Sequence, residues 1–407
     1  MTIAPNIQAT TTNRTSTGVP GFVERYANWT DEQSDRAAVL AGRMDAGEFD
    51  MIRVSFVDPH GFPRTKWLAP QVFSSALRSG LDYSLAPFIQ DTGQDIAVDL
   101  FARGVGHDLP EFEGSSDFVA VPDPLTFRSL PWAPRTGWVL ADEFFKTGSR
   151  LPLSPRNALR QQVQRLERRG QTYVVGLEIE FYLTRLVRNE LSFGDVGGFG
   201  TPGTAPTVQP VDLGYQFNGD DHLDQIADFL MPLCGTLVDL GLPLRSAEHE
   251  SGPGQIEITF EPLEGLAGAD AVILFKAAVR QFARRNGFHA SFMCKPALQG
   301  CDPSGWHLHQ SIADSQTGHN LFMSDVPGQL VSQLAENFAG GLIANAAASS
   351  LFTTPTINGY QRYSESHTLA PTLAGWADDN RGAMIRVLGA PHDPSPDFSG
   401  IIAGDGV

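Results

Sequence analysis

The sequence is poor in cysteine, which excludes the structural uses of clustered thiols. Its 407 residues include three cysteines, Cys234, Cys294 and Cys301, an odd number with no C-x-x-C pair. Disulfide frameworks and cysteine-ligated zinc modules both depend on closely spaced pairs. The sequence therefore predicts neither. Because unpaired cysteines are typical of a reducing compartment, we expect a cytoplasmic protein.

Long hydrophobic runs and basic patches are also missing. No stretch of about 18 apolar residues occurs, and the polar N-terminus "MTIAPNIQATTTNRTSTGVPG" lacks the apolar segment of a signal peptide. Acidic residues outnumber basic ones by 46 to 29, which gives a formal net charge of -17. A surface of that charge repels nucleic acid. We therefore expect neither a membrane span nor a nucleic-acid partner.

Apolar residues are plentiful enough for a large core, at 42% of the chain. The order of local signals predicts an α+β protein. Its predicted parts are a disordered tail at 1–20, an N-terminal domain at 21–145 and a second domain at 146–407. In the N-terminal domain, residues 51–57 and a second strand through Trp67 predict a hairpin, closed by a turn at Asp58-Pro59-His60-Gly61.

Helices are predicted where capping residues flank strong helix formers or apolar periodicity. Ser154 is a suitable N-cap, Pro155 suits the first turn, and Gly170 suits the stop after "RNALRQQVQRLERR". Further helices are predicted over 30–48, 223–241 and 268–286.

The stretch "VVGLEIEFYL", residues 174–183, has strand composition but carries two glutamates. Side chains alternate along a strand, so Glu178 and Glu180 share one face with Gly176 and Tyr182. Unpaired ionised carboxylates are too costly to bury in a core. This face is therefore expected to meet water or a cation.

Two more predicted strands and one downstream segment repeat the pattern of chemistry-bearing side chains. Across a Gly-Pro-Gly turn, "HESGPGQIE" places Glu250 before Glu257, and His249 either supports Glu250 or belongs to the site. The remaining members are His307, His309 and Ser311 in "SGWHLHQSI", and Arg381 and Arg386 in "NRGAMIRV".

Carboxylates and imidazoles from several strands point to a site for divalent cations. Carboxylate oxygens are the ligands that Mg²⁺ prefers, and histidine is compatible with Mn²⁺. Two such ions about 3.5–4 Å apart stabilise phosphoryl transfer, with arginines neutralising the phosphate oxygens. No G-x-x-x-x-G-K-[ST] motif is present, so the prediction of ATP use depends on this cluster.

The motifs "GLEIEF", "HESGPGQIE", "SGWHLHQS" and "NRGAMIR" occur in the order of those of the glutamine synthetase superfamily, which the chain resembles over about residues 30–390. The resemblance implies a small β-grasp-like N-terminal domain and a catalytic domain with a curved antiparallel sheet. It also implies a homo-oligomer, in ring-shaped dodecamers or decamers. The implied reaction joins the γ-carboxylate of glutamate to an amine or ammonia through a γ-glutamyl phosphate, with ATP as co-substrate and two Mg²⁺ or Mn²⁺ ions.

The resemblance assigns roles to ten residues by position. The ligands of the first ion are Glu180, Glu250 and Glu257, and those of the second are Glu178 and His307. The nucleotide contacts are His309 and Ser311, the glutamate-binding residue is Arg362, and the phosphate-binding residues are Arg381 and Arg386.

The sequence departs from the family pattern in two places. Leu369 stands where ammonia-using members carry an acidic residue, which favours an alkyl or aryl amine over ammonia. After "NRGAMIRV" the family's E-x-R and "ANPYL" segments are missing, so we also expect a truncated C-terminus. The leading hypothesis is a γ-glutamyl amide synthetase. The alternatives are an ammonia-dependent glutamine synthetase, or an inactive regulatory relative that binds nucleotide without turnover.

Overall fold

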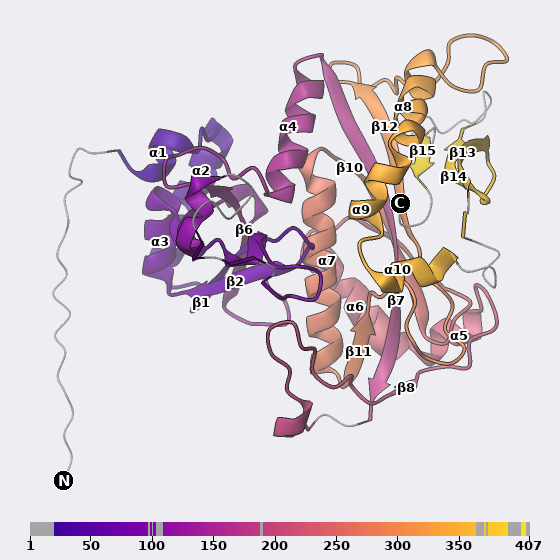
Figure 1. Cartoon of the computed structure of the whole chain (residues 1–407), viewed down its shortest axis with the longest axis horizontal. Coiled ribbons are helices and arrows are strands. Elements are labelled where there is room, and N and C mark those ends of the chain that lie inside the picture. Colours follow the sequence, from indigo (N-terminus) through magenta and orange to yellow (C-terminus); the bar gives the residue numbers. More distant parts are fainter. Residues whose placement is uncertain are drawn as a thin grey trace.

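The computed structural model describes residues 20–96, 98–99, 101–102, 109–187, 190–363, 370–371, 373–389 and 400–403. Apart from Pro20, the predicted disordered tail lies outside these residues. Figure 1 shows two bodies of structure side by side, one built from the first third of the chain and one around the long strands that follow.

The first body combines a mixed sheet with three helices (Figure 1). Its helices are α1 (Phe22–Tyr26), α2 (Asp31–Asp45) and α3 (Pro70–Ser79). Its strands are β1 (Met51–Val57), β2 (Pro63–Leu68), β3 (Leu81–Ser84), β4 (Asp117–Pro122), β5 (Arg128–Ser129) and β6 (Thr136–Phe144). The strand order is β2-β1-β6-β4-β3, with β5 on β6.

The predicted hairpin is confirmed, because β1 and β2 pair antiparallel and Val57 stands opposite Pro63. Alternate β1 residues enter an aromatic core, where the buried Phe56 ring packs edge-on against Tyr83 and Phe118. This hairpin therefore anchors the first sheet to its helical layer.

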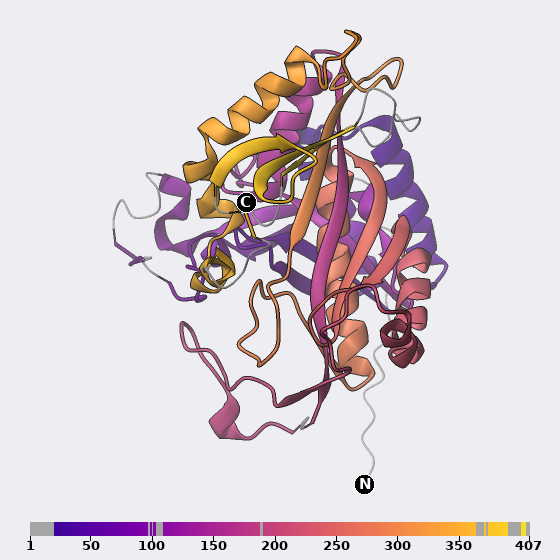
Figure 2. The same ribbon diagram turned by 90° about the vertical axis from the view of Figure 1, so that its right-hand side faces the viewer.

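The second body is a curved nine-stranded sheet with helices on its faces (Figure 2). Its helices are α4 (Pro155–Glu167), α5 (Asp220–Gln225), α6 (Ala227–Asp239), α7 (Leu266–Arg285), α8 (Gln333–Ala344), α9 (Ala346–Thr353) and α10 (Ile357–Tyr360). Its strands are β7 (Gln171–Leu186), β8 (Val208–Pro210), β9 (Leu244–His249), β10 (Gln255–Glu264), β11 (Phe288–Ser291), β12 (Trp306–Asp314), β13 (Leu373–Asp378), β14 (Ala383–Leu388) and β15 (Gly400–Ala403).

The strand β7 is the centre of this sheet. The main order is β13-β14-β15-β12-β7-β10-β9, and β8 and β11 also pair with β7. The described pairs are antiparallel except β13–β14, which are parallel. The predicted α+β class with a curved, mainly antiparallel catalytic sheet is confirmed.

One face of β7 packs into the main core. Leu177, Ile179 and Phe181 are buried against apolar residues of α6 and α7, and the Phe181 ring lies 6.1 Å from that of Phe275 in α7. Trp138 of β6 joins the same cluster, so the two bodies share a core. The two sheets fall on either side of the domain boundary predicted near residue 145, which stays a prediction.

Three predicted helices correspond to α2, α4 and α7. The helix predicted over 223–241 is confirmed in large part by α6, but the structure has two helices, α5 and α6, with a break at Ile226 (φ -109°, ψ 8°). The Ile226 side chain is buried in the main core, and this packing outweighs the local helical preference. Among the described residues, none of the helices has the length and apolar character needed to cross a membrane.

Replacing Ser154 with alanine is expected to destabilise the fold by about 1–3 kcal/mol. The buried Ser154 hydroxyl accepts a hydrogen bond from the Asn157 amide at 3.0 Å and donates one to the buried Glu143 carboxyl at 2.6 Å. The substitution removes both bonds. Urea unfolding measures the change, with Ser75→Ala at an exposed position of α3 as the control. Equal effects of the two substitutions would contradict the expectation.

Candidate functional site

The register of three adjacent strands brings the predicted acidic and imidazole side chains together. Glu180 of β7 stands directly opposite Glu257 of β10, and Glu178 of β7 stands opposite His307 of β12. His309 of β12 faces Gly176 two residues further along. Because paired residues in neighbouring strands project to the same face, these side chains gather on one side of the sheet. The structure therefore brings these residues together, and the metal-ligand roles predicted for them stay predictions.

The cluster is held by short polar contacts. Nδ1 of His307 lies 2.9 Å from Oε2 of Glu178, and Nε2 of His309 lies 2.9 Å from Oε1 of the same Glu178 carboxylate. His307 is also 4.0 Å from Oε2 of Glu257. Ligand atoms of Glu178, Glu257 and His307 all lie within 4.8 Å of one another, a separation that one cation can span.

Glu180 and Glu250 flank this group. The buried Glu180 accepts a hydrogen bond from the Gln255 side chain, Nε2 to Oε2, at 2.7 Å. Glu250 follows β9, and its backbone amide donates to the Gln255 carbonyl at 2.9 Å. Gln255 therefore fixes one carboxylate and closes the turn that carries another. Gln255 belongs to the motif "HESGPGQIE", but the sequence assigned it no function.

The carboxylates are close enough to perturb one another. Burial raises the pKa of Glu257 to about 8, and the charges of Glu178 and Glu180 add to the shift. Burial likewise raises the pKa of Glu250 to about 7, reinforced by Glu180 and Glu248. Burial also disfavours ionisation of Glu178, but hydrogen bonds from His307 and His309 outweigh it and hold the pKa of Glu178 well below its usual range.

These electrostatics fit a divalent cation. The carboxyl groups of Glu250 and Glu257 have raised pKa values, whereas that of Glu178 has a lowered pKa and is ionised. Like charges directly opposite in a sheet are destabilising unless something compensates them. Oxygen donors with one imidazole are a suitable donor set for Mg²⁺ or Mn²⁺. The residues present therefore match the chemistry expected from the sequence.

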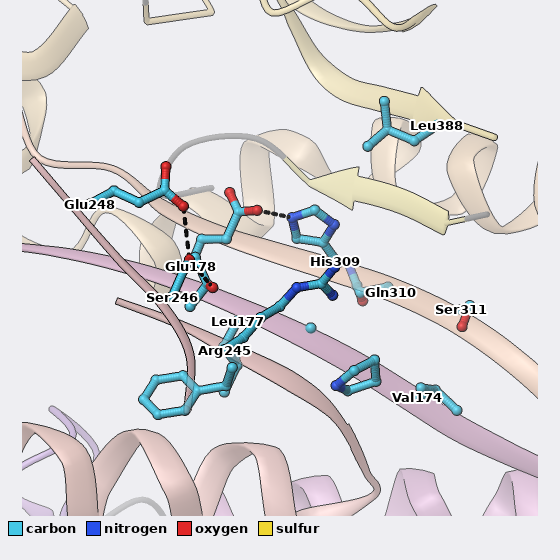
Figure 3. A pocket seen from close by; sticks show the side chains of 14 residues that line it. Val174, Leu177, Glu178, Arg245, Ser246, Glu248, His309, Gln310, Ser311 and Leu388 are labelled. Carbon is cyan, nitrogen blue, oxygen red and sulfur yellow. Dashed lines mark hydrogen bonds and ion pairs between the residues drawn. The ribbon is translucent and has the colours of Figure 1, made fainter. Parts of the chain in front are cut away.

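A cavity of about 310 Å³ adjoins the cluster. Figure 3 shows Glu178 and His309 among the side chains that line it, together with Arg245 and Glu248 of β9 and Leu388 of β14. Ser311, which sequence analysis grouped with His309, also lines it. Arg245 and Glu248 were missed by sequence analysis because they belong to no motif, and only the β9–β10 pairing brings them here.

The three predicted arginines lie in different surroundings. Arg362 is buried, and its Nη1 donates to the carbonyl of Ser304. Arg381 is exposed, yet near enough that its charge acts against the burial that raises the pKa of Glu250. Nε and Nη2 of Arg386 both donate to Oδ1 of Asp379, at 2.8 and 2.5 Å. The substrate contacts predicted for these arginines stay predictions.

Two features of the sequence analysis lie at or beyond the edge of the described structure. Leu369 is outside the described residues. Most of the segment after "NRGAMIRV" is also outside, but β15 is described and pairs with both β12 and β14. Residues 400–403 thus lie inside the sheet, next to the strand that carries His307.

Comparisons with known proteins place this geometry in a family. Residues 152–396 match the model of the glutamine synthetase catalytic domain. A gamma-glutamylanilide synthase from Acinetobacter sp. is 42% identical over 378 residues, which cover 92% of this chain and 75% of that protein. The gamma-glutamylethanolamide synthetase GlnA4 of Streptomyces coelicolor is 30% identical over 365 residues, 89% of this chain and 73% of that protein.

A solved structure agrees with the sequence comparisons. The structure of a GmaS/ADP complex superposes with a TM-score of 0.69 at 27% identity, covering 90% of this chain and 76% of that one. Enzymes of the matched family use ATP and a divalent metal ion. The resemblance inferred from the ordered motifs is therefore confirmed: the chain belongs to the glutamine synthetase family, in its gamma-glutamyl amide synthetase branch.

Proposed function

We propose that this protein is an ATP-dependent ligase that joins the γ-carboxylate of glutamate to an amine. The observation that carries the proposal is the convergence of Glu178, Glu257 and His307, from three paired strands, within 4.8 Å. A carboxylate is a poor electrophile because its anionic oxygen is a poor leaving group. Phosphorylation converts that oxygen into a good leaving group, so the site must stabilise the negative charge of the transferring phosphoryl group.

The proposed reaction has two steps. A γ-carboxylate oxygen of glutamate forms a bond to the terminal phosphorus of ATP while the bond to ADP breaks. The amine nitrogen then attacks the carbonyl carbon of the γ-glutamyl phosphate, inorganic phosphate leaves, and the nitrogen loses a proton. Divalent ions, when bound, supply positive charge to the transferring phosphoryl oxygens.

The two ends of the site suggest where the substrates bind. The cavity bounded by His309 and Ser311 is the proposed nucleotide end, and Arg245 at its wall supplies a cation for phosphate. Arg362, whose Nη1 donates to the carbonyl of Ser304, is the proposed glutamate-binding residue. Arg381 and Arg386 are the proposed phosphate ligands. Because Arg386 faces Asp379, this role requires it to exchange that partner for phosphate.

The finer assignments follow the positions of these residues in the motifs of the family. We assign Glu180, Glu250 and Glu257 to one ion and Glu178 and His307 to a second, with Mg²⁺ or Mn²⁺ as the metal. Family resemblance supports ring-shaped homo-oligomers with sites between subunits. Within the amine class, we favour an aromatic amine of the aniline type, because the anilide synthase matches at 42% identity and the ethanolamide synthetase at 30%.

ADP release in the presence of glutamate, ATP and Mg²⁺ or Mn²⁺ tests the proposal across aniline, ethanolamine, ethylamine and ammonium. We expect turnover to be fastest with aniline, and chromatography to show the matching γ-glutamyl amide. Stimulation by ammonium alone would contradict amine specificity. If calorimetry shows ATP–Mg²⁺ binding but no amine gives ADP, the ligase assignment is wrong and the regulatory alternative is favoured.

A further inference from the structure

A second cluster of metal-ligating side chains lies beside the carboxylate site and takes no part in the proposed reaction. It consists of Asp212 from the loop after β8, His222 from α5 and His249 at the end of β9. All three are buried, and the side chains of Asp212 and His249 are 0% exposed. Figure 1 shows α5 at the end of the sheet opposite α8. One ligand atom of each residue lies within 4.8 Å of the others.

The hydrogen bonding of His249 leaves a lone pair facing a carboxylate. Nδ1 of His249 lies 3.1 Å from the carbonyl oxygen of Gln216, which accepts hydrogen bonds only, so Nδ1 carries the proton. In the neutral ring Nε2 is then an unprotonated acceptor, 3.4 Å from Oδ2 of Asp212. Nε2 is buried and has no hydrogen-bond partner among the described residues. Two facing acceptors repel each other unless a cation lies between them.

His222 approaches the same carboxylate from another side. Its Nδ1 is buried, without a hydrogen-bond partner in the described part of the chain, and lies 3.7 Å from Oδ1 of Asp212. The two imidazole rings stack with centroids 4.4 Å apart. Two imidazole nitrogens, Nδ1 of His222 and Nε2 of His249, thus lie within 3.7 Å of one buried carboxylate.

Backbone amides orient that carboxylate. Gly214 donates to Oδ1 of Asp212 at 2.7 Å, and Gly254 donates to Oδ2 at 3.0 Å. Both glycines have positive φ, and a Cβ at Gly254 would lie 2.3 Å from the Leu183 carbonyl oxygen. Outer contacts of this kind, including the bond from His249 to a carbonyl, typically hold the ligands of a metal ion in place.

The spacing distinguishes a metal ion from a shared proton. Separations of 3.4 and 3.7 Å are long for a hydrogen bond between nitrogen and oxygen. They are close to the edge of a tetrahedron whose metal–ligand bonds are about 2.0–2.2 Å, which is roughly 3.4 Å.

We propose that Asp212, His222 and His249 bind a structural transition-metal ion of the Zn²⁺ class, separate from the ions of the carboxylate site. Two imidazoles and one carboxylate suit zinc better than magnesium. The ion would tie the loop after β8 and the helix α5 to the turn that begins at Glu250. This inference does not depend on the proposed ligase activity.

The test measures metal retention in the full-length protein. Protein expressed with zinc is dialysed against excess Mg²⁺, and bound zinc is counted by mass spectrometry. We expect about one zinc per chain. A cobalt-loaded sample should show the visible absorption of a tetrahedral Co²⁺ site. Asp212→Asn and the milder His222→Gln should each reduce retained zinc at least tenfold and abolish that absorption.

Two controls separate the sites. Glu257→Gln alters the carboxylate cluster and should retain zinc, as should His319→Gln at an exposed histidine. The proposal is overturned if the wild-type protein retains no zinc, if His222→Gln retains as much as wild type, or if Glu257→Gln loses it. Should Asp212→Asn fail to fold, His222→Gln alone decides between these outcomes.

Discussion

Replacing Glu257 with glutamine is expected to lower ligase turnover by about a thousand-fold or more. Glutamine keeps the shape of the side chain but removes the charge that a divalent ion needs. Glu257 lies at the centre of the cluster, opposite Glu180 in the sheet and 4.0 Å from His307. The measurement is ADP release with glutamate and the best amine at saturating Mn²⁺.

A matched substitution on the same strand controls for nonspecific damage. Glu264 is exposed at the far end of β10, and Glu264→Gln is expected to leave turnover within about twofold of wild type, since surface changes of this kind rarely matter. Undiminished turnover in Glu257→Gln would rule out this carboxylate as a metal ligand. A loss in both variants would indicate a general defect of the strand.

The stability of the metal-free protein is expected to fall as pH rises from about 5 to 8. The pKa of Glu257 is raised to about 8 and that of Glu250 to about 7, from an ordinary value of 4.5. A carboxyl whose pKa is raised by folding stabilises the native state fully below its ordinary pKa. That contribution is lost as pH rises through the folded-state pKa. For Glu257 the loss is on the order of 4 kcal/mol.

Added Mn²⁺ is expected to reverse this trend. The ion binds the ionised carboxylates, so its stabilising effect grows as protons leave the site. Thermal unfolding at pH 5.5 and pH 8, with and without Mn²⁺, checks the prediction. The Mn²⁺-induced rise in midpoint should be clearly larger at pH 8, and Glu257→Gln should reduce it. Glu143, whose pKa burial raises to about 7, contributes to the metal-free slope in both proteins. An Mn²⁺ effect independent of pH would contradict the prediction.

Much of the chemistry was predictable because it is local in sequence. Alternation along residues 174–183 placed Glu178 and Glu180 on one face. The structure confirms this, because Glu178 pairs with His307 of β12 and Glu180 pairs with Glu257 of β10. The cap at Ser154 and the hairpin at 51–67 were also read from adjacent residues. In these cases neighbouring residues carry the whole signal, since turn, cap and strand preferences act over a few positions.

Features that depend on long-range packing were not predictable in the same way. The break at Ile226 divides a segment whose local pattern favours one helix, and burial of that side chain decides it. The roles of Arg245 and Glu248 at the cavity arise from strand pairing across the β9–β10 turn. The partner that Arg386 adopts, Asp379, likewise has no signature in the motif that contains Arg386.

The sequence by itself determined which residue types meet in this protein, their order along the chain, and so the family to which it belongs. The tertiary structure alone decided the distances among them, and with these the raised pKa values of Glu250 and Glu257. It also decided that Asp212, His222 and His249 converge, although no motif links them. The physical reason is that residue preferences act over a few neighbouring positions, whereas burial and charge coupling depend on chain segments that only the packed sheet brings together.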